Sequence, residues 1–181
     1  MEKLMVEYAD WSIGRFVSMV EKKPWFSNTL FVFIADHGAT MNTVYDMSLA
    51  YNHIPLLFFA PQILTPHFVD RLAMQIDVAP TILGLLGIDA SDRMLGVNLM
   101  THNRKLAYFS ADDKIGVVDG ELLYLYRAKQ EKASIYRYLE RDTVDLIGQY
   151  TERAEAMRRH AFGMTQMAQQ MLLDGTTKCS K

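Results

Sequence analysis

Two uninterrupted apolar runs indicate that the chain contains buried strands. Residues 29–35 and 54–60 are rich in Phe, Val, Leu and Ile, without alternating apolar and polar positions. Such runs are typical of central strands covered on both faces, as in a parallel sheet. Ahead of the first run, bulky side chains recur on neighbouring helical turns from Leu4 to Val20, which predicts an amphipathic helix ending before Pro24.

Farther along, the pattern predicts a short helix and then an antiparallel ribbon. Asp77 is placed to cap the helix, Pro80 suits its first turn, and Gly87 ends it after an apolar stretch. Three short β-like segments follow, at residues 106–110, 115–118 and 122–126. Asp119-Gly120, between the last two segments, is a strong signal for a two-residue hairpin.

From about residue 142 the helical period returns, so we divide the chain into residues 1–141 and a terminal helix with a polar tail, residues 142–181. Apolar positions of this helix step by alternate threes and fours, as in a heptad seam: Ile147, Tyr150, Ala154, Met157, Ala161, Met164, Ala168 and Met171. The seam either packs on the rest of the same chain or pairs with a second copy. Gly163 weakens a free-standing helix, which favours packing within the chain.

Composition and charge narrow the classes of function. The 181 residues are 50% hydrophobic, as expected of one domain or part of a larger one. With 19 Lys and Arg against 21 Asp and Glu, the formal net charge of -2 argues against a nucleic-acid partner. The single cysteine, Cys179, cannot form an internal disulfide. The longest apolar run is far shorter than the roughly 20 residues that span a bilayer, so any membrane anchor would lie outside this chain.

A carboxylate and an imidazole directly follow the most apolar strand. Asp36 and His37 lie where ligands gather in parallel sheets, and Gly38 lets the chain turn so that both side chains can face one point. An arbitrary Asp-His-Gly is more often a turn-forming aspartate and a hydrogen-bonded loop histidine. A charged carboxylate at the end of a buried strand is costly, however, unless it is paired or bound to metal. The position therefore favours half of a divalent-metal site, which suits manganese or zinc better than calcium.

The remaining histidines are weaker candidates. His53 precedes the second strand and could approach a phosphate or sulfate near the metal, although a hydrogen-bonded loop position explains it equally well. His67, His102 and His160 lie beside a proline, in a polar turn and in the terminal helix, where solvated or structural roles are the default. Asp77 is assigned a structural role as a helix cap.

Several motifs taken together resemble one enzyme family. They are residues 8–16 (Tyr-Ala-Asp-Trp-Ser-Ile-Gly-Arg-Phe), 28–30 (Asn-Thr-Leu), 35–38 (Ala-Asp-His-Gly), 53–56 (His-Ile-Pro-Leu) and 75–83 (Gln-Ile-Asp-Val-Ala-Pro-Thr-Ile-Leu). In these motifs the chain resembles the carboxyl-terminal part of the sulfatase branch of the alkaline phosphatase superfamily. Lipoteichoic acid synthase and phosphoglycerol transferase type enzymes are nearest in character. The resemblance implies an α/β fold: a partial α/β/α sandwich with a small antiparallel β appendix and a long C-terminal helix.

The resemblance also implies roles for single residues. Asp36 and His37 match late metal ligands of the family, and His53 matches a histidine near the transferred group in part of the family. The implied reaction is substitution at phosphorus or sulfur of a sulfate or phosphate ester, through a covalent enzyme intermediate. In the family an earlier half supplies an acidic ligand and the nucleophile, and this chain is expected to begin after that half. We therefore expect the chain alone to be catalytically silent, with a metal site that is empty or weak until that half completes it.

Two interpretations of the chain's role stay open. In the first, it is the carboxyl-terminal portion of a metal-dependent hydrolase or transferase whose parent is membrane-anchored, with an extracytoplasmic catalytic domain. In the second, it is a non-catalytic assembly module that self-associates through the terminal helix. In both, strands built for the middle of a larger sheet would expose an edge, and we expect a homo-oligomer that covers it.

Overall fold

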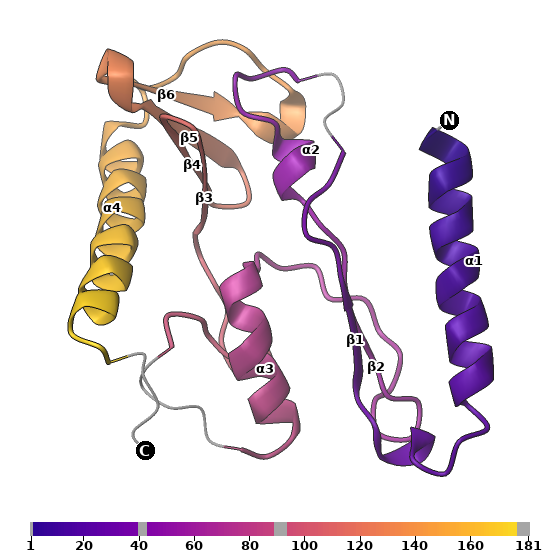
Figure 1. The fold of residues 1–181 in the computed structure, drawn as a ribbon. Helices are drawn as coiled ribbons and strands as arrows, with labels where there is room; N and C mark the ends of the chain where they lie inside the picture. The colour runs from indigo at the N-terminus through magenta and orange to yellow at the C-terminus, as the bar shows by residue number, and fades with distance from the viewer. Residues whose placement is uncertain (1, 40–42, 89–93, 177–181) are drawn as a thin grey trace. The chain divides into compact units, whose positions relative to one another are not determined.

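The computed structural model of the protein describes residues 2–39, 43–88 and 94–176, so Cys179 lies outside the described residues. It is a mixed α/β fold with a C-terminal helix, as predicted, and the sheets of the described residues are antiparallel (Figure 1). Within these ranges, no helix combines the length and the apolar character needed to cross a membrane. The helices and strands are α1 (Glu2–Val20), β1 (Phe31–Ile34), α2 (Leu49–Asn52), β2 (Leu56–Phe59), α3 (Val78–Leu85), β3 (Ala107–Ala111), β4 (Lys114–Val118), β5 (Leu122–Arg127), β6 (Lys132–Arg137) and α4 (Thr151–Leu173).

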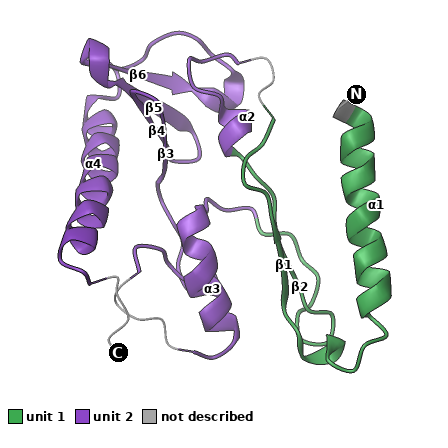
Figure 2. Cartoon of the chain, in the orientation of Figure 1, with its two compact units in different colours: residues 1–39, 53–69 green, residues 40–52, 70–181 purple. Residues whose placement is uncertain are grey.

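The chain forms two compact units, which Figure 2 colours separately. Unit 1 contains residues 1–39 and 53–69, and therefore α1, β1 and β2. Unit 2 contains residues 40–52 and 70–181, and therefore the remaining elements. The chain thus crosses from one unit to the other three times.

In unit 1 the two predicted apolar strands are present, but their setting differs from the prediction. β1 and β2 pair antiparallel, with Phe31 opposite Phe59 and Ile34 opposite Leu56, whereas a parallel sheet of central strands was expected. The two strands make up this whole sheet in the part of the chain that the structure describes. Because each strand has an open edge and incompletely covered faces, Ile34 and Leu57 are exposed rather than buried.

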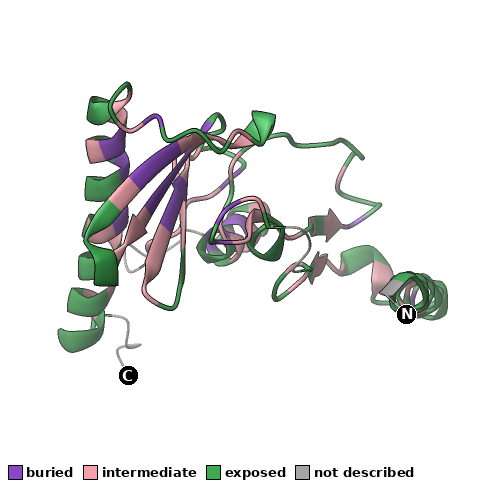
Figure 3. Cartoon of the chain, turned by 90° about the horizontal axis from the view of Figure 1, so that it is seen from above, coloured by how far each residue is buried: buried purple, intermediate pink, exposed green. Residues whose placement is uncertain are grey.

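Aromatic rings connect this ribbon to the end of α1. The Phe31 ring lies 5.5–6.3 Å, centroid to centroid, from the rings of Phe16, Trp25, Phe26 and Phe59. Such distances are those of favourable aromatic pairs. The helix itself is confirmed over the predicted range, but most of its residues are exposed (Figure 3).

In unit 2 the predicted antiparallel ribbon is confirmed and has four strands in the order β3-β4-β5-β6. Asp119, Gly120 and Glu121 lie between β4 and β5, so the connection is one residue longer than the predicted two-residue hairpin; Gly120 takes a φ of 93°, which a side chain would disfavour. The Asp119 carboxylate accepts hydrogen bonds from the Leu122 amide at 2.8 Å and from the Arg153 guanidinium of α4. The hairpin is therefore tied to the terminal helix.

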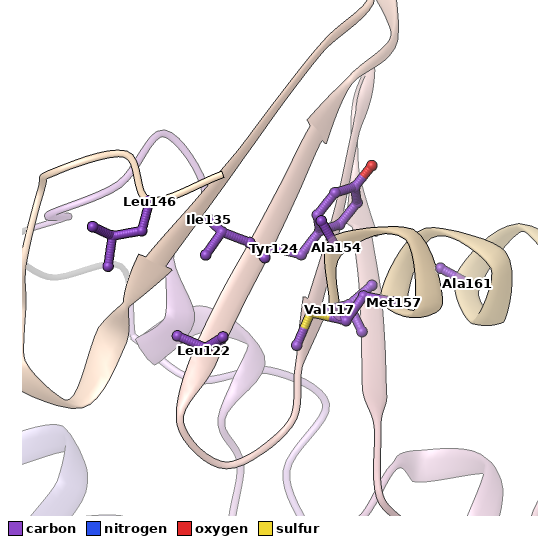
Figure 4. Close-up of a cluster of buried hydrophobic side chains, with 8 residues drawn as sticks. All are labelled: Val117, Leu122, Tyr124, Ile135, Leu146, Ala154, Met157 and Ala161. Atoms are coloured by element: carbon purple, nitrogen blue, oxygen red, sulfur yellow. The ribbon is translucent and has the colours of Figure 1, made fainter. Parts of the chain in front are cut away.

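The main core of unit 2 lies between one face of this sheet and α4 (Figure 4). This packing confirms the interpretation in which the seam packs within the chain, at least for its first half. The helix begins at Thr151 rather than near residue 142, because Asp145 accepts hydrogen bonds from the Ile135 and Ile147 amides and holds a turn there. The buried members of the core are Val117, Leu122, Tyr124, Ile135, Leu146, Ala154, Met157 and Ala161.

Candidate functional site

The antiparallel pairing of β1 and β2 brings the candidate residues to one end of the ribbon. Ile34, the last residue of β1, lies opposite Leu56, the first residue of β2. Asp36 and His37 follow Ile34 closely, and His53 precedes Leu56 by the same interval that separates His37 from Ile34. A parallel pairing would have placed His53 at the opposite end. The antiparallel pairing, which was not predicted, therefore brings the three candidate residues to one end of the ribbon.

Asp36 and His37 form a compact local pair. The His37 amide donates to Asp36 Oδ1 at 2.8 Å, and His37 Nε2 lies 3.7 Å from Asp36 Oδ2. His37 Nδ1 lies 2.9 Å from the carbonyl oxygen of Gly38. A carbonyl only accepts, so Nδ1 carries the proton of this hydrogen bond, and in the neutral ring Nε2 holds the lone pair. The side chains of the pair therefore turn a carboxylate oxygen and an imidazole nitrogen toward each other.

The Asp36–His37 pair is accessible to solvent, whereas a buried carboxylate was expected from the sequence. The Asp36 side chain is 88% exposed and the His37 side chain 51% exposed. The expected cost of burying a carboxylate at the end of β1 is thus absent in this structure, because β1 is not covered on both faces. What supports a site here is the geometry of the donors rather than a desolvation penalty.

The donor chemistry fits a divalent transition metal, although the pair offers only two ligands. Carboxylate oxygen and imidazole nitrogen suit zinc and manganese. Among the residues that the structure describes, no three or more His, Cys, Asp or Glu side chains gather as a metal site. His53 is exposed at the same end of the ribbon. The three residues can therefore provide one side of a metal and anion site.

The other histidines have surface or structural surroundings, as predicted. His67 Nδ1 is 2.9 Å from the Thr65 carbonyl oxygen on the surface, and His102 Nδ1 is 2.9 Å from the hydroxyl of its neighbour Thr101. His160 lies on the sheet side of α4, with its ring 6.1 Å from that of Tyr108, and its Nε2 is buried without a hydrogen-bond partner among the described residues. Burial lowers the pKa of His160, and the cation of Arg104 lowers it further.

Asp77 has a structural role, as predicted, but by a different mechanism. It occupies the N-cap position of α3, yet its side chain makes no cap hydrogen bond. Its fully buried carboxylate instead accepts hydrogen bonds from the Met74 amide at 2.8 Å, the Val97 amide at 2.9 Å and the guanidinium of Arg104. This clamp was not predicted, because Arg104 lies in a polar segment that carries no motif.

The comparisons with known proteins find similarity to sulfatases. The sulfatase family model matches residues 4–88, which include all three candidate residues. Arylsulfatase K of Xenopus laevis is 29% identical over 101 residues, which are 53% of this chain and 19% of that protein. An endo-4-O-sulfatase of Bacteroides thetaiotaomicron is 28% identical over 133 residues, which are 68% of this chain and 25% of that protein.

Solved structures extend the similarity over most of the chain. A protein of the alkaline phosphatase superfamily from Vibrio parahaemolyticus superposes with a TM-score of 0.71 and 27% identity, over 90% of this chain and 41% of that one. A phosphonate monoester hydrolase from Silicibacter pomeroyi shares the fold, with a TM-score of 0.62 and 20% identity over 94% of this chain and 39% of that one. The chain spans about a fifth to a quarter of the curated relatives' length. Together these similarities support a sulfatase-type chain with an alkaline phosphatase superfamily fold.

Proposed function

We propose that this sulfatase-type chain forms one side of the active site of a metal-dependent enzyme acting on sulfate or phosphate esters. The observation that carries the proposal is the Asp36–His37 pair, with 3.7 Å between its donor atoms, at the same end of the ribbon as His53. All three residues lie in the range matched by the family model. Two of the similar proteins are named as sulfatases, which makes a sulfate ester the first substrate class to test.

In this proposal Asp36 and His37 are metal ligands. The carboxylate would coordinate through oxygen and the imidazole through Nε2, while the hydrogen bond from Nδ1 to Gly38 fixes the orientation of the ring. Manganese or zinc suits this donor set better than calcium, which prefers oxygen ligands alone. A bound cation would lower the pKa of an attacking oxygen and offset charge on the non-bridging oxygens of the ester.

His53 would contact the anionic ester group. Imidazole can donate a hydrogen bond to a sulfate or phosphate oxygen, and it can also pass a proton to a departing alkoxide. Sulfate and phosphate esters both present negatively charged oxygens around a tetrahedral sulfur or phosphorus, so these three residues suit either ester. Phosphoglycerol transfer by a membrane-anchored parent enzyme is the finer form of this proposal.

Two protein ligands rarely hold a divalent ion against water. We therefore propose that further ligands and the nucleophile come from a part of the enzyme outside this chain, and that the chain alone is inactive.

The alternative role is self-association through α4. Less of the helix surface is free for it, since Ala154, Met157 and Ala161 are buried within the chain. Met167, Leu172 and Leu173 remain exposed on that helix, so a homo-oligomer stays a prediction.

Metal binding by the purified chain tests the ligand pair directly. Titration with Mn²⁺, followed by electron paramagnetic resonance, is expected to show weak binding that falls at least tenfold in Asp36→Ala and in His37→Ala. His67→Ala is the matched control, because His67 is exposed in the same unit and its Nδ1 also lies 2.9 Å from a carbonyl oxygen. Equal Mn²⁺ affinity in all four proteins would remove the support for a site here.

Activity assays complete the test. We expect no turnover of an aryl sulfate or a phosphodiester by the chain alone. Turnover that is present in the wild type and abolished by Asp36→Ala would overturn the expectation that the isolated chain is silent, while supporting the roles of the pair.

A further inference from the structure

Residues 40–52 separate the Asp36–His37 pair from His53 in the sequence, and their described part, residues 43–52, is anchored. The segment belongs to unit 2, where it covers the face of the four-stranded sheet opposite to α4. Tyr45 and Met47 are buried there against Leu123 and Leu125 of β5. Residues 43–52, which lie between His37 and His53 in the sequence, are therefore packed into the core of unit 2.

An ion pair fixes the middle of the segment. Arg127, the last residue of β5, donates from Nε to Asp46 Oδ2 at 2.7 Å and from Nη2 to Asp46 Oδ1 at 2.9 Å. Its Nη1 donates to Ser134 Oγ of β6 at 3.2 Å. The Arg127 side chain is 12% exposed and the Asp46 side chain 39%, and the contact is bidentate, a geometry that strengthens a charged hydrogen bond.

Tyr45 provides a second fixed point. Its hydroxyl donates to the carbonyl oxygen of Asp142 at 2.7 Å, and its ring lies 4.8 Å from that of Tyr136 in β6. Burial raises the pKa of Tyr45, and the neighbouring Asp142 carboxylate raises it further, so the hydroxyl keeps its proton and its role as donor. Ring packing and hydrogen bond together fix both ends of this side chain.

Residues 48–52 connect these anchors to His53. Ser48 follows Met47, and its hydroxyl accepts a hydrogen bond from the Tyr51 amide at 3.1 Å. Asn52 Nδ2 donates to the Ser48 carbonyl oxygen at 2.8 Å, which closes the single turn of α2. His53 is the next residue, and β2 begins three positions later. No flexible spacer of glycines lies between the anchor and the histidine.

We propose that Arg127 and Tyr45 are positioning residues for His53: they anchor residues 45–47 on the four-stranded sheet, and α2 passes this constraint to the backbone of His53. The inference rests on the proposed function, in which His53 contacts the ester. It adds that Arg127, far along the chain on β5, and Tyr45, in the segment before α2, determine how well that histidine is held. Without the anchor, residues 43–52 become a loop with more conformations to lose when the site binds an anion.

Backbone dynamics in the full chain test the proposal. The measurement is the ¹⁵N order parameter of the Tyr51 and His53 amides. Order parameters near 0.85 describe rigid backbone and values below about 0.6 flexible backbone. We expect Arg127→Met to lower the order parameters of both amides from near 0.85 toward 0.6. Arg127→Lys keeps the charge but loses the planar fork, and is expected to have an intermediate effect. Tyr45→Phe, which removes only the hydrogen bond to Asp142, is expected to have the smallest effect.

Arg159→Met is the matched control, because Arg159 is an exposed arginine of α4 that pairs with Glu155 at 3.9 Å. This substitution is expected to leave the order parameters of both amides unchanged. The His67 amide should not respond in any variant, which separates loss of the anchor from general loosening. Unchanged Tyr51 and His53 order parameters in Arg127→Met, with the native circular dichroism spectrum retained, overturn the proposal.

Titration with inorganic sulfate distinguishes this failure from failure of the proposed function. If His53 contacts the ester, wild type binds sulfate, His53→Ala weakens binding at least fivefold, and Arg127→Met weakens it with an increase in the dissociation rate. If wild type and His53→Ala bind sulfate equally, the proposed function loses its anion contact, while the order parameters still decide whether Arg127 positions His53.

Discussion

The two units differ in where they keep their chemistry and where they keep their buried residues. Both clusters of buried apolar side chains belong to unit 2, between α4, the four-stranded sheet and the segment before α2. In the described part of unit 1, only Val20 and Ala60 are buried. The candidate residues Asp36, His37 and His53 nevertheless belong to unit 1. In this chain, the unit with the candidate site has almost no core of its own.

The difference extends to polar groups. Unit 2 buries Asp77, Thr81 and Ser134, and each takes part in hydrogen bonds with defined partners. The polar candidates of unit 1 are all exposed. Stability differs between regions of a protein according to burial and contact density. We therefore expect unit 2 to dominate the free energy of unfolding, and substitutions in the two units to differ accordingly.

The largest effect is expected from breaking the buried ion pair of unit 2. Arg104→Met leaves the Asp77 carboxylate buried without its cation, and loss of one partner of such a pair costs about 3–5 kcal/mol. Urea denaturation followed by circular dichroism measures this loss. The double variant Asp77→Asn, Arg104→Met should recover part of it, because no charge is then left unpaired.

Arg159→Met is the control for this prediction, since its exposed pair with Glu155 should contribute less than about 1 kcal/mol. A loss in Arg104→Met no greater than in this control would show that the clamp between α3 and the segment before β3 does not limit stability.

A slightly smaller effect is expected from a cavity in the core. Leu123 is completely buried in β5 against Tyr45 and Met47, and Leu123→Ala should lower the free energy of unfolding by about 2–5 kcal/mol. Leu139→Ala is the control in the same unit, because Leu139 is exposed. Equal effects of the two substitutions would contradict the assignment of this face as core. Leu123→Ala should also loosen the segment that leads to His53.

His160 should give unit 2 a moderate dependence of stability on pH. Its folded pKa is lowered by burial and by Arg104, so the unfolded chain binds the proton more readily. The contribution is therefore complete above the unfolded value of about 6.5 and is lost as the pH falls toward the folded pKa. The free energy of unfolding of wild type should decrease from pH 7.5 to pH 5.5, and His160→Leu should reduce this decrease. His67→Gln, which alters an exposed histidine, should keep the wild-type dependence, and an identical slope in all three proteins would exclude His160 as its source.

The sequence predicted the elements better than their partners. The apolar runs identified β1 and β2, the Asp119-Gly120 pair identified the hairpin, and the seam identified α4. These features depend on local pattern, which a single sequence contains. Parallel or antiparallel pairing of β1 and β2 depends on the path of the residues between them, and no local pattern predicts that Tyr45 and Met47 of that segment are buried.

The candidate site shows the same division. Asp36 and His37 are neighbours in sequence, so their proximity could be predicted, whereas the place of His53 at the same end of the ribbon follows from the antiparallel register. The Asp77–Arg104 clamp and the Asp46–Arg127 anchor join residues far apart in the chain, and neither pair has a sequence spacing that indicates contact. A single sequence specifies such charged residues individually, but not which of them are partners.

The smallest effect is expected in unit 1, where it also tests the predicted homo-oligomer. Leu57 of β2 is 53% exposed, so Leu57→Ala should lower the free energy of unfolding by less than about 1 kcal/mol, measured by the same urea denaturation as Leu123→Ala. This expectation holds if the β1–β2 ribbon meets solvent in the protein as it exists in solution. If a second copy covers the ribbon, Leu57 is buried at an interface, and the loss should approach that of a core leucine and depend on protein concentration. Light scattering on both proteins separates the cases, because a dimer that Leu57→Ala dissociates would show that the apolar residues of unit 1 are buried against a second copy of the chain.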